Sequence, residues 1–189
     1  MEQHALIPDF SFLERVESFG PFNAAECFQC RKCTNGCPAS FEMDLFPDQI
    51  IRLAVLGQRA EILQSKTIWI CASCETCSTR CPNGIRIAEL MDYFKEMAVR
   101  SGVPTALPRI SGFHKAFLEN IRFTGRVFEG ALLPVWWART GQIGEKIRTG
   151  EVRNDLKQAM GLFSRNRMSL GPRKIKGRSQ VKAILRSSR

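Results

Sequence analysis

Two stretches decide the fold of this 189-residue chain: Cys27-Phe28-Gln29-Cys30-Arg31-Lys32-Cys33-Thr34-Asn35-Gly36-Cys37-Pro38 and Cys71-Ala72-Ser73-Cys74-Glu75-Thr76-Cys77-Ser78-Thr79-Arg80-Cys81-Pro82. We call them the first and the second string. Both have the spacing C-x2-C-x2-C-x3-C-P, and together they contain all eight cysteines of the chain. Any cysteine chemistry is therefore confined to these two strings.

The repeated spacing is typical of proteins that bind two iron–sulfur cubanes. Three thiolates at positions i, i+3 and i+6 can each bind one iron, whereas the fourth ligand must come from elsewhere because a short loop cannot close around the cluster. In two-cluster ferredoxins the cysteine before proline ligates the other cluster. We therefore predict two [4Fe-4S] clusters with crossed ligands. The ligands are Cys27, Cys30, Cys33 and Cys81 for cluster 1, and Cys71, Cys74, Cys77 and Cys37 for cluster 2.

Disulfides and zinc sites are the alternatives for eight cysteines. Disulfides would leave the regular spacing unexplained, and the N-terminal residues lack the basic start and apolar run of a secretion signal. Two zinc sites could be built from C-x2-C pairs, but zinc needs neither the third cysteine nor the C-P ending. Iron and acid-labile sulfide would separate the cluster hypothesis from both alternatives.

The formal charge of +10 belongs mainly to one end of the chain. Residues 165–189 hold nine basic residues and no acid, so 19 basic and 18 acidic residues remain in residues 1–164. The tail also lacks the aromatic residues on which bases stack. We therefore expect no nucleic-acid partner, and we expect this tail to be an extended arm that docks on an acidic partner.

No stretch of the sequence approaches the roughly 20 apolar residues that cross a bilayer. The longest apolar patch, residues 131–138, is short and contains Pro134. We therefore expect no transmembrane segment and a cytoplasmic protein.

Apolar residues recur at helical spacing along most of the chain, and no useful strand pattern is found. The link between the strings predicts a helix from Pro47 to Gly57 with Ile50, Leu53 and Ala54 on one face, and with Ile51 and Val55 beside that face. Further helices are expected near residues 12–19, 59–64, 87–98, 109–124 and 151–163. The 109–124 helix should have an apolar face, formed by Ile110, Phe113, Phe117 and Ile121. The predicted fold class is all-α.

We predict four parts in this order along the chain. Residues 1–20 are a leader helix and residues 21–105 hold both clusters. Residues 106–164 are a helical C-terminal extension, and residues 165–189 are the basic docking tail.

Two such strings joined by a helical link resemble the α-helical ferredoxin fold, and within it the chain is most similar to the C subunit of heterodisulfide reductase. The resemblance rests on Ile68-Trp69-Ile70-Cys71-Ala72-Ser73-Cys74-Glu75-Thr76-Cys77 with Cys81-Pro82, and on the ending Leu170-Gly171-Pro172-Arg173-Lys174-Ile175-Lys176-Gly177. It covers most of residues 20–185.

The resemblance implies a non-catalytic electron relay in an oxidoreductase complex. In that family the relay passes electrons between two partners: the A subunit, which bears flavin, and the B subunit, which is catalytic and reduces the coenzyme M–coenzyme B heterodisulfide in methanogens. A hydrogenase or formate dehydrogenase module would connect through the A subunit. Cys-Cys-Gly motifs belong to the B subunit, whereas this chain has no adjacent Cys-Cys pair. The alternative implied is a redox module of a membrane-bound, quinone-linked oxidoreductase.

Overall fold

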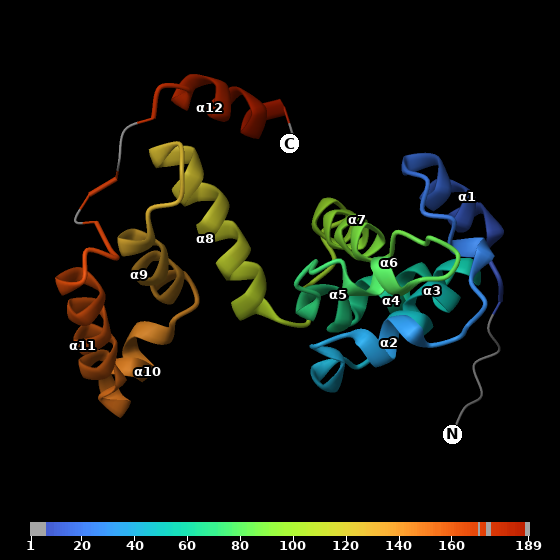
Figure 1. The fold of residues 1–189 in the computed structure, drawn as a ribbon, viewed down its shortest axis with the longest axis horizontal. Helices are drawn as coiled ribbons and strands as arrows, with labels where there is room; N and C mark the ends of the chain where they lie inside the picture. The colour runs from blue at the N-terminus through green and yellow to red at the C-terminus, as the bar shows by residue number, and fades with distance from the viewer. Residues whose placement is uncertain (1–6, 170, 173–174, 188–189) are drawn as a thin grey trace. The chain divides into compact units, whose positions relative to one another are not determined.

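The chain is described by a computed structural model that covers residues 7–169, 171–172 and 175–187. These residues form helices, turns and loops without a strand, which confirms the predicted all-α fold (Figure 1). The chain divides into two compact units, Met1–Leu107 and Pro108–Arg189. The division of the chain into four parts stays a prediction.

The first unit contains both cysteine strings within a set of short helices. Its helices are α1 (Phe10–Phe19), α2 (Lys32–Gly36), α3 (Pro47–Val55), α4 (Arg59–Gln64), α5 (Thr67–Ile70), α6 (Thr76–Arg80) and α7 (Ile87–Arg100), with 3-10 turns η1 (Ala24–Glu26) and η2 (Ser40–Glu42). The helices predicted near residues 12–19, 47–57, 59–64 and 87–98 are confirmed.

The core of the first unit lies where α1, α3, α4 and α7 pack together. Phe12 of α1 lies against Phe94 of α7 with the ring centroids 6.2 Å apart, and both side chains are fully buried. Gly57 follows α3 with φ +75, and a Cβ there would lie 2.1 Å from the carbonyl oxygen of Asp9. Only glycine fits this position, which lets the chain before α1 pair with the end of α3.

The predicted apolar face of α3 needs one correction. Ile50 and Ala54 are buried as predicted, but Ile51 is fully buried while Leu53 is only half-buried. The reason is that α3 has two covered sides. Ile51 faces a space between the cysteine strings, which a single helical face drawn from the sequence does not include.

The second unit consists of five helices among the described residues. They are α8 (Pro108–Thr124), α9 (Glu129–Arg139), α10 (Gln142–Thr149), α11 (Glu151–Ser164) and α12 (Arg178–Ser187). The helices predicted over residues 109–124 and 151–163 are confirmed. Within the described part of the chain, no helix is long and apolar enough to cross a membrane.

The apolar face predicted for α8 is half-buried and packs in part on α9, where Phe113 lies 5.4 Å from Trp136 between ring centroids, but the most buried residues of α8 are others. Its buried residues are Ser111, Ala116 and Asn120, whereas the four apolar residues of the predicted face are only half-buried. The Asn120 side chain accepts a hydrogen bond from the Phe128 backbone N–H at 2.7 Å and donates one to the Phe128 carbonyl at 3.0 Å. Because its polar atoms are satisfied by backbone, Asn120 can face α9 in place of an apolar residue.

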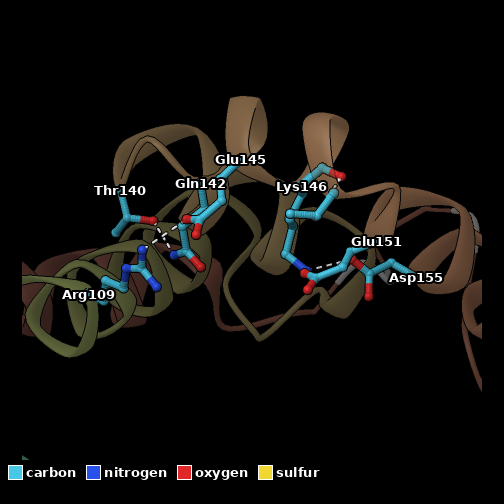
Figure 2. Close-up of polar contacts among 8 residues, drawn as sticks. Arg109, Thr140, Gln142, Glu145, Lys146, Glu151 and Asp155 are labelled. Atoms are coloured by element: carbon cyan, nitrogen blue, oxygen red, sulfur yellow. Dashed lines mark hydrogen bonds and ion pairs between the residues drawn. The ribbon is translucent and has the colours of Figure 1, made fainter.

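Polar contacts join the helices of the second unit (Figure 2). Arg109 of α8 forms an ion pair with Glu145 of α10, with 3.0 Å between Nη2 and Oε2. Lys146 of α10 lies 2.7 Å from the Asp155 carboxylate and 3.6 Å from that of Glu151, both on α11. Lys146 therefore ties α10 to α11.

Residues 178–187 of the basic tail form the helix α12, so the prediction of an extended arm is wrong for these residues. Val181 and Leu185 are half-buried one turn apart, and α12 packs on α8. Arg178 donates a hydrogen bond to the Phe123 carbonyl at the end of α8. Three predicted basic residues of the tail lie outside the described residues: Arg173, Lys174 and Arg189.

Candidate cluster-binding site

The two strings share one backbone conformation as well as one spacing. In each string, two non-glycine residues have positive φ at equivalent places: Gln29 (56) and Arg31 (59) in the first, Ser73 (51) and Glu75 (61) in the second. Such conformations cost about 1–3 kcal/mol each and persist only where surrounding structure demands them. Each left-handed pair turns the chain around its cysteines and leads into a five-residue helix, α2 or α6.

The first pocket is a space of about 330 Å³, part of it open to solvent, between the two strings. Its cysteines are Cys27, Cys30, Cys33 and Cys81. Asp48 and Ile51 of α3 line one side, and Ile85 and Ile87 line another.

The second pocket has the same construction with the strings exchanged, and it encloses about 430 Å³, part of it open to solvent. Its cysteines are Cys71, Cys74, Cys77 and Cys37. Ala88 and Met91 of α7 line one side, and Met43 and Pro47 line another. The structure therefore brings the eight cysteines together in the two groups named in the sequence analysis; their role as ligands stays a prediction.

Close packing between the strings carries each fourth cysteine to the other pocket. Helices α2 and α6 pack against each other, and a Cβ on Gly36 would lie 2.7 Å from Cδ of Arg80. The Asn83 amide, just after the second string, donates a hydrogen bond to the Glu26 carbonyl, just before the first. Glycine at position 36 thus allows the approach that places Cys37 and Cys81.

Asp44 connects the end of the first string to the start of the second. Its carboxylate accepts hydrogen bonds from the backbone N–H groups of Lys66 (2.8 Å) and Thr67 (3.1 Å), at the start of α5. Burial opposes ionisation of Asp44, but the hydrogen bonds from Lys66 and Thr67 outweigh it and lower the pKa below 3.8. Since Cys71 directly follows α5, Asp44 fixes the entry of the second string.

The cysteine thiols are free, and those facing the interior are hard to ionise. Burial, followed by the neighbouring Cys71, raises the pKa of Cys77 to about 11, and burial also raises the pKa values of Cys33 and Cys71. The pKa of the exposed Cys74 is lowered by its contact with the Thr76 hydroxyl. Because iron binds thiolates, assembly of a metal centre here must release protons.

The donor set fits a cluster with several iron atoms. Among the described residues, no three His, Cys, Asp or Glu side chains are grouped to hold a single metal ion. Four thiols instead surround each of two larger spaces. Four cysteine thiolates around such a space are the usual ligands of a [4Fe-4S] cluster.

Comparison with known proteins agrees with this geometry. Residues 23–85 match the family described as 4Fe-4S dicluster domain. This segment, about a third of the chain, is similar to a dicluster domain. It contains both strings, α3 and both pockets' cysteines, so the predicted pair of [4Fe-4S] clusters is confirmed at the level of the domain.

The chain is also similar to subunits of methanogen reductases. It is 33% identical over 94 residues to the C subunit of the H2:CoB-CoM heterodisulfide,ferredoxin reductase of Methanothermobacter marburgensis, covering 50% of this chain and 51% of the relative. It is 38% identical over 90 residues to the C subunit of the ferredoxin:CoB-CoM heterodisulfide reductase of Methanosarcina mazei, covering 48% and 55%. The chain thus spans about half the length of the curated relatives it matches, and the predicted resemblance is confirmed there.

Several residues at the pockets were not singled out as site residues from the sequence. Asp48 falls within the predicted helix from Pro47 to Gly57 and has no role assigned from the sequence, yet it lines the first pocket. Ile51, Ile87 and Met91 were assigned to helices, yet they also line the pockets. Alignment of the two strings does not reveal them, because the link from Pro38 to α3 is longer than the link from Pro82 to α7.

Proposed function

We propose that this chain is the electron-transfer subunit of a cytoplasmic, heterodisulfide-reductase-like complex. In it the chain carries electrons between two partners: the flavin-bearing A subunit, and the catalytic B subunit, which reduces a disulfide. The observation that carries the proposal is the pair of four-cysteine pockets in one compact unit. The names of the relatives support the same role.

The proposed ligands are the two crossed groups of cysteines. The first pocket would hold its cluster through Cys27, Cys30, Cys33 and Cys81, and the second through Cys71, Cys74, Cys77 and Cys37. A bound cluster supplies reversible one-electron transfer. The chain itself contributes apolar walls that limit water, and a hydrogen bond from the Gln29 amide to the Cys27 sulfur at 3.2 Å. Both features tune such clusters.

Each pocket is open to a partner at one edge. Cys30 and Cys74 occupy equivalent places in the two strings, and both are exposed. Phe28, beside Cys30, is 76% exposed and offers an apolar contact at the rim of the first pocket. A redox partner that packs on either edge would come close to the thiols.

The second unit supports a lasting association with other proteins of the complex. Among its described residues, every helix exposes large apolar side chains: Leu118, Phe123, Leu133, Val135, Ile143, Ile147, Val152, Leu156, Met160, Leu162, Phe163 and Ile184. Exposed apolar surface on this scale marks protein interfaces. We propose that this unit, with the basic residues of the tail, docks on the flavin-bearing and catalytic partners.

The test is to load the purified full chain with iron and sulfide under anaerobic conditions. About eight iron and eight sulfide per chain are expected, four of each per cluster. The loaded chain alone should be reducible by dithionite but should not reduce a disulfide, and it should restore activity to the purified flavin-bearing and catalytic partners. A Cys27→Ser, Cys71→Ser double variant is the control and should not restore activity. Zinc without sulfide, or disulfide reduction by the chain alone, would contradict the proposal.

A further inference from the structure

The two pockets repeat each other in detail. Each backs onto a helix whose second residue donates its backbone N–H to a hydroxyl in the string. Asp48 of α3 donates to Thr34 Oγ1 at 3.3 Å, and Ala88 of α7 donates to Ser78 Oγ at 3.1 Å. Thr34 and Ser78 each follow the third cysteine of their string. Asp48 and Ala88 are therefore equivalent, and the equivalence places a carboxylate in the first pocket and a methyl group in the second.

The Asp48 carboxylate is buried beside the first pocket. Only 7% of its side chain is exposed, and it accepts a hydrogen bond from the Thr34 hydroxyl. Its counter-ion Arg31 lies 3.6 Å away, but 74% of the Arg31 side chain is exposed. Water screens Arg31 far more than Asp48. The net field of this pair inside the first pocket is therefore negative.

A second charged residue, Lys95, also has no charged counterpart in the other half of the repeat, and its charge is positive. Lys95 of α7 donates a hydrogen bond to the Cys71 carbonyl at 2.8 Å, at the start of the second string. Its side chain is 13% exposed, whereas its counter-ion Asp92, 2.9 Å away, is 52% exposed. Counted from the helix start, the residue of α3 that corresponds to Lys95 is the apolar Val55. The less exposed member of this pair is positive.

Other charges near the strings lie in water. Lys32 lines the first pocket and Glu75 belongs to the second string, and both are exposed. Their signs oppose those of Asp48 and Lys95. Solvent screening reduces the effect of exposed charges, while buried charges act through a lower effective dielectric. The two buried charges therefore dominate the difference between the pockets.

We propose that Asp48 lowers the reduction potential of the cluster in the first pocket and Lys95 raises that of the cluster in the second, so that an electron shared by the two rests in the second pocket. A nearby negative charge disfavours reduction, and a positive charge favours it. Movement of one electron between the sites oxidises one and reduces the other, and it makes or breaks no bond. The inference rests on the proposed function, in which both pockets hold clusters, and it gives that relay a direction.

The test is a potentiometric titration of the loaded full chain, followed by electron paramagnetic resonance. The wild-type chain should show two potentials. Asp48→Asn keeps the size and an acceptor for Thr34, and it should raise the lower potential. Lys95→Met should lower the higher one. Each shift should change the reduced-to-oxidised ratio of one cluster about tenfold at fixed applied potential, which is 59 mV for one electron.

Two further variants make the test decisive. Ala88→Asp puts a carboxylate at the equivalent place of the second pocket and should lower the higher potential, which keeps the inference testable if Asp48→Asn loads poorly. Glu96→Gln removes an exposed charge of α7 that pairs with Arg100, and it should move neither potential. Movement of the higher potential by Asp48→Asn, or no movement with Lys95→Met, would refute the inference.

Measured iron and sulfide separate this failure from failure of the proposed function. If the wild-type chain does not assemble two clusters, the relay proposal is wrong. If two clusters assemble and titrate but the variants shift neither potential, only the assignment of Asp48 and Lys95 is wrong.

Discussion

Replacing the last cysteine of a string tests the crossed arrangement most directly. Cys37 belongs to the first string by sequence but lies at the second pocket. In Cys37→Ser the backbone N–H of residue 37 can still donate to the Thr34 carbonyl, a bond of 3.1 Å that ends α2. The substitution therefore removes one thiol of the second pocket and leaves the first pocket with all four.

The expected magnitude follows from this count of thiols. Iron should fall from about eight to about four per chain, because a cubane that lacks one of four thiolates is lost while the other is retained. Cys74→Ser should give the same loss, since Cys74 lines the same pocket. Cys30→Ser and Cys81→Ser should lose the other cluster. Iron, sulfide and the resonance spectrum of the surviving cluster measure all four variants.

The pairing of the variants decides the result. Variants of the same pocket should leave the same surviving cluster. The spectrum of Cys37→Ser should match that of Cys74→Ser, and the spectrum of Cys81→Ser should match that of Cys30→Ser. If Cys37→Ser instead leaves the same surviving spectrum as Cys30→Ser, each string holds its own cluster and the crossed assignment is wrong. Ser40→Ala is the control, because it removes a hydroxyl bonded to the Cys37 carbonyl without removing a thiol, and both clusters should remain.

Three further predictions concern stability and assembly. Asp44→Asn should lower the free energy of unfolding by about 1–2 kcal/mol, which is less than the worth of two charged hydrogen bonds because Asp44 is exposed. The pKa of Asp44 is lowered in the folded chain, so its stabilisation is full above pH 3.8 and is lost as the pH falls through the folded pKa. Urea unfolding of the variant should therefore depend less on acid than that of the wild type. Phe94→Ala should lower the free energy of unfolding by about 3–5 kcal/mol and release the clusters at lower urea concentration, because Phe94 of α7 is fully buried against Phe12 of α1. An unchanged urea midpoint would contradict this packing. Changing Arg165 and Arg167 to Glu should weaken binding to the flavin-bearing and catalytic partners, as measured by copurification, while the absorbance of the clusters stays unchanged. If the unaltered chain instead copurifies with a haem-bearing membrane protein, the quinone-linked alternative is favoured.

The cysteine groups and most helices could be predicted because their signals are local and periodic. Cysteine spacing limits which thiols can surround one cluster, and apolar residues of α7 recur at helical spacing. The equivalence of Asp48 and Ala88 could not be seen in the same way. The link from Pro38 to α3 is longer than the link from Pro82 to α7, so an alignment of the strings does not align the two helices.

The second unit shows a different limit of sequence reasoning. In α8 the buried residues are small or polar, because Asn120 bonds to backbone and Gly112 approaches Thr140 closely, with a Cβ position 2.6 Å from the Thr140 methyl group. Apolar periodicity predicts the helix and the face on which Phe113 meets Trp136, but not the small and polar residues that are buried most deeply. In the tail, the sequence predicts an extended arm, although the helix α12 begins directly after Gly177.

The two pockets share the arrangement of their cysteines but differ in the charged residues beside them. In the proposed assignment, crossed cysteines and left-handed turns set the positions of the ligands. Because each pocket takes cysteines from both strings, neither string can change alone. Asp48 and Lys95 contribute no thiol, and each has an exposed counter-ion that limits the cost of burying its charge. Their charges can therefore set the two potentials apart while the ligand geometry stays the same. In the proposed relay, the similar geometry of the two sites allows rapid electron transfer between the clusters, and the unequal reduction potentials give that transfer a direction.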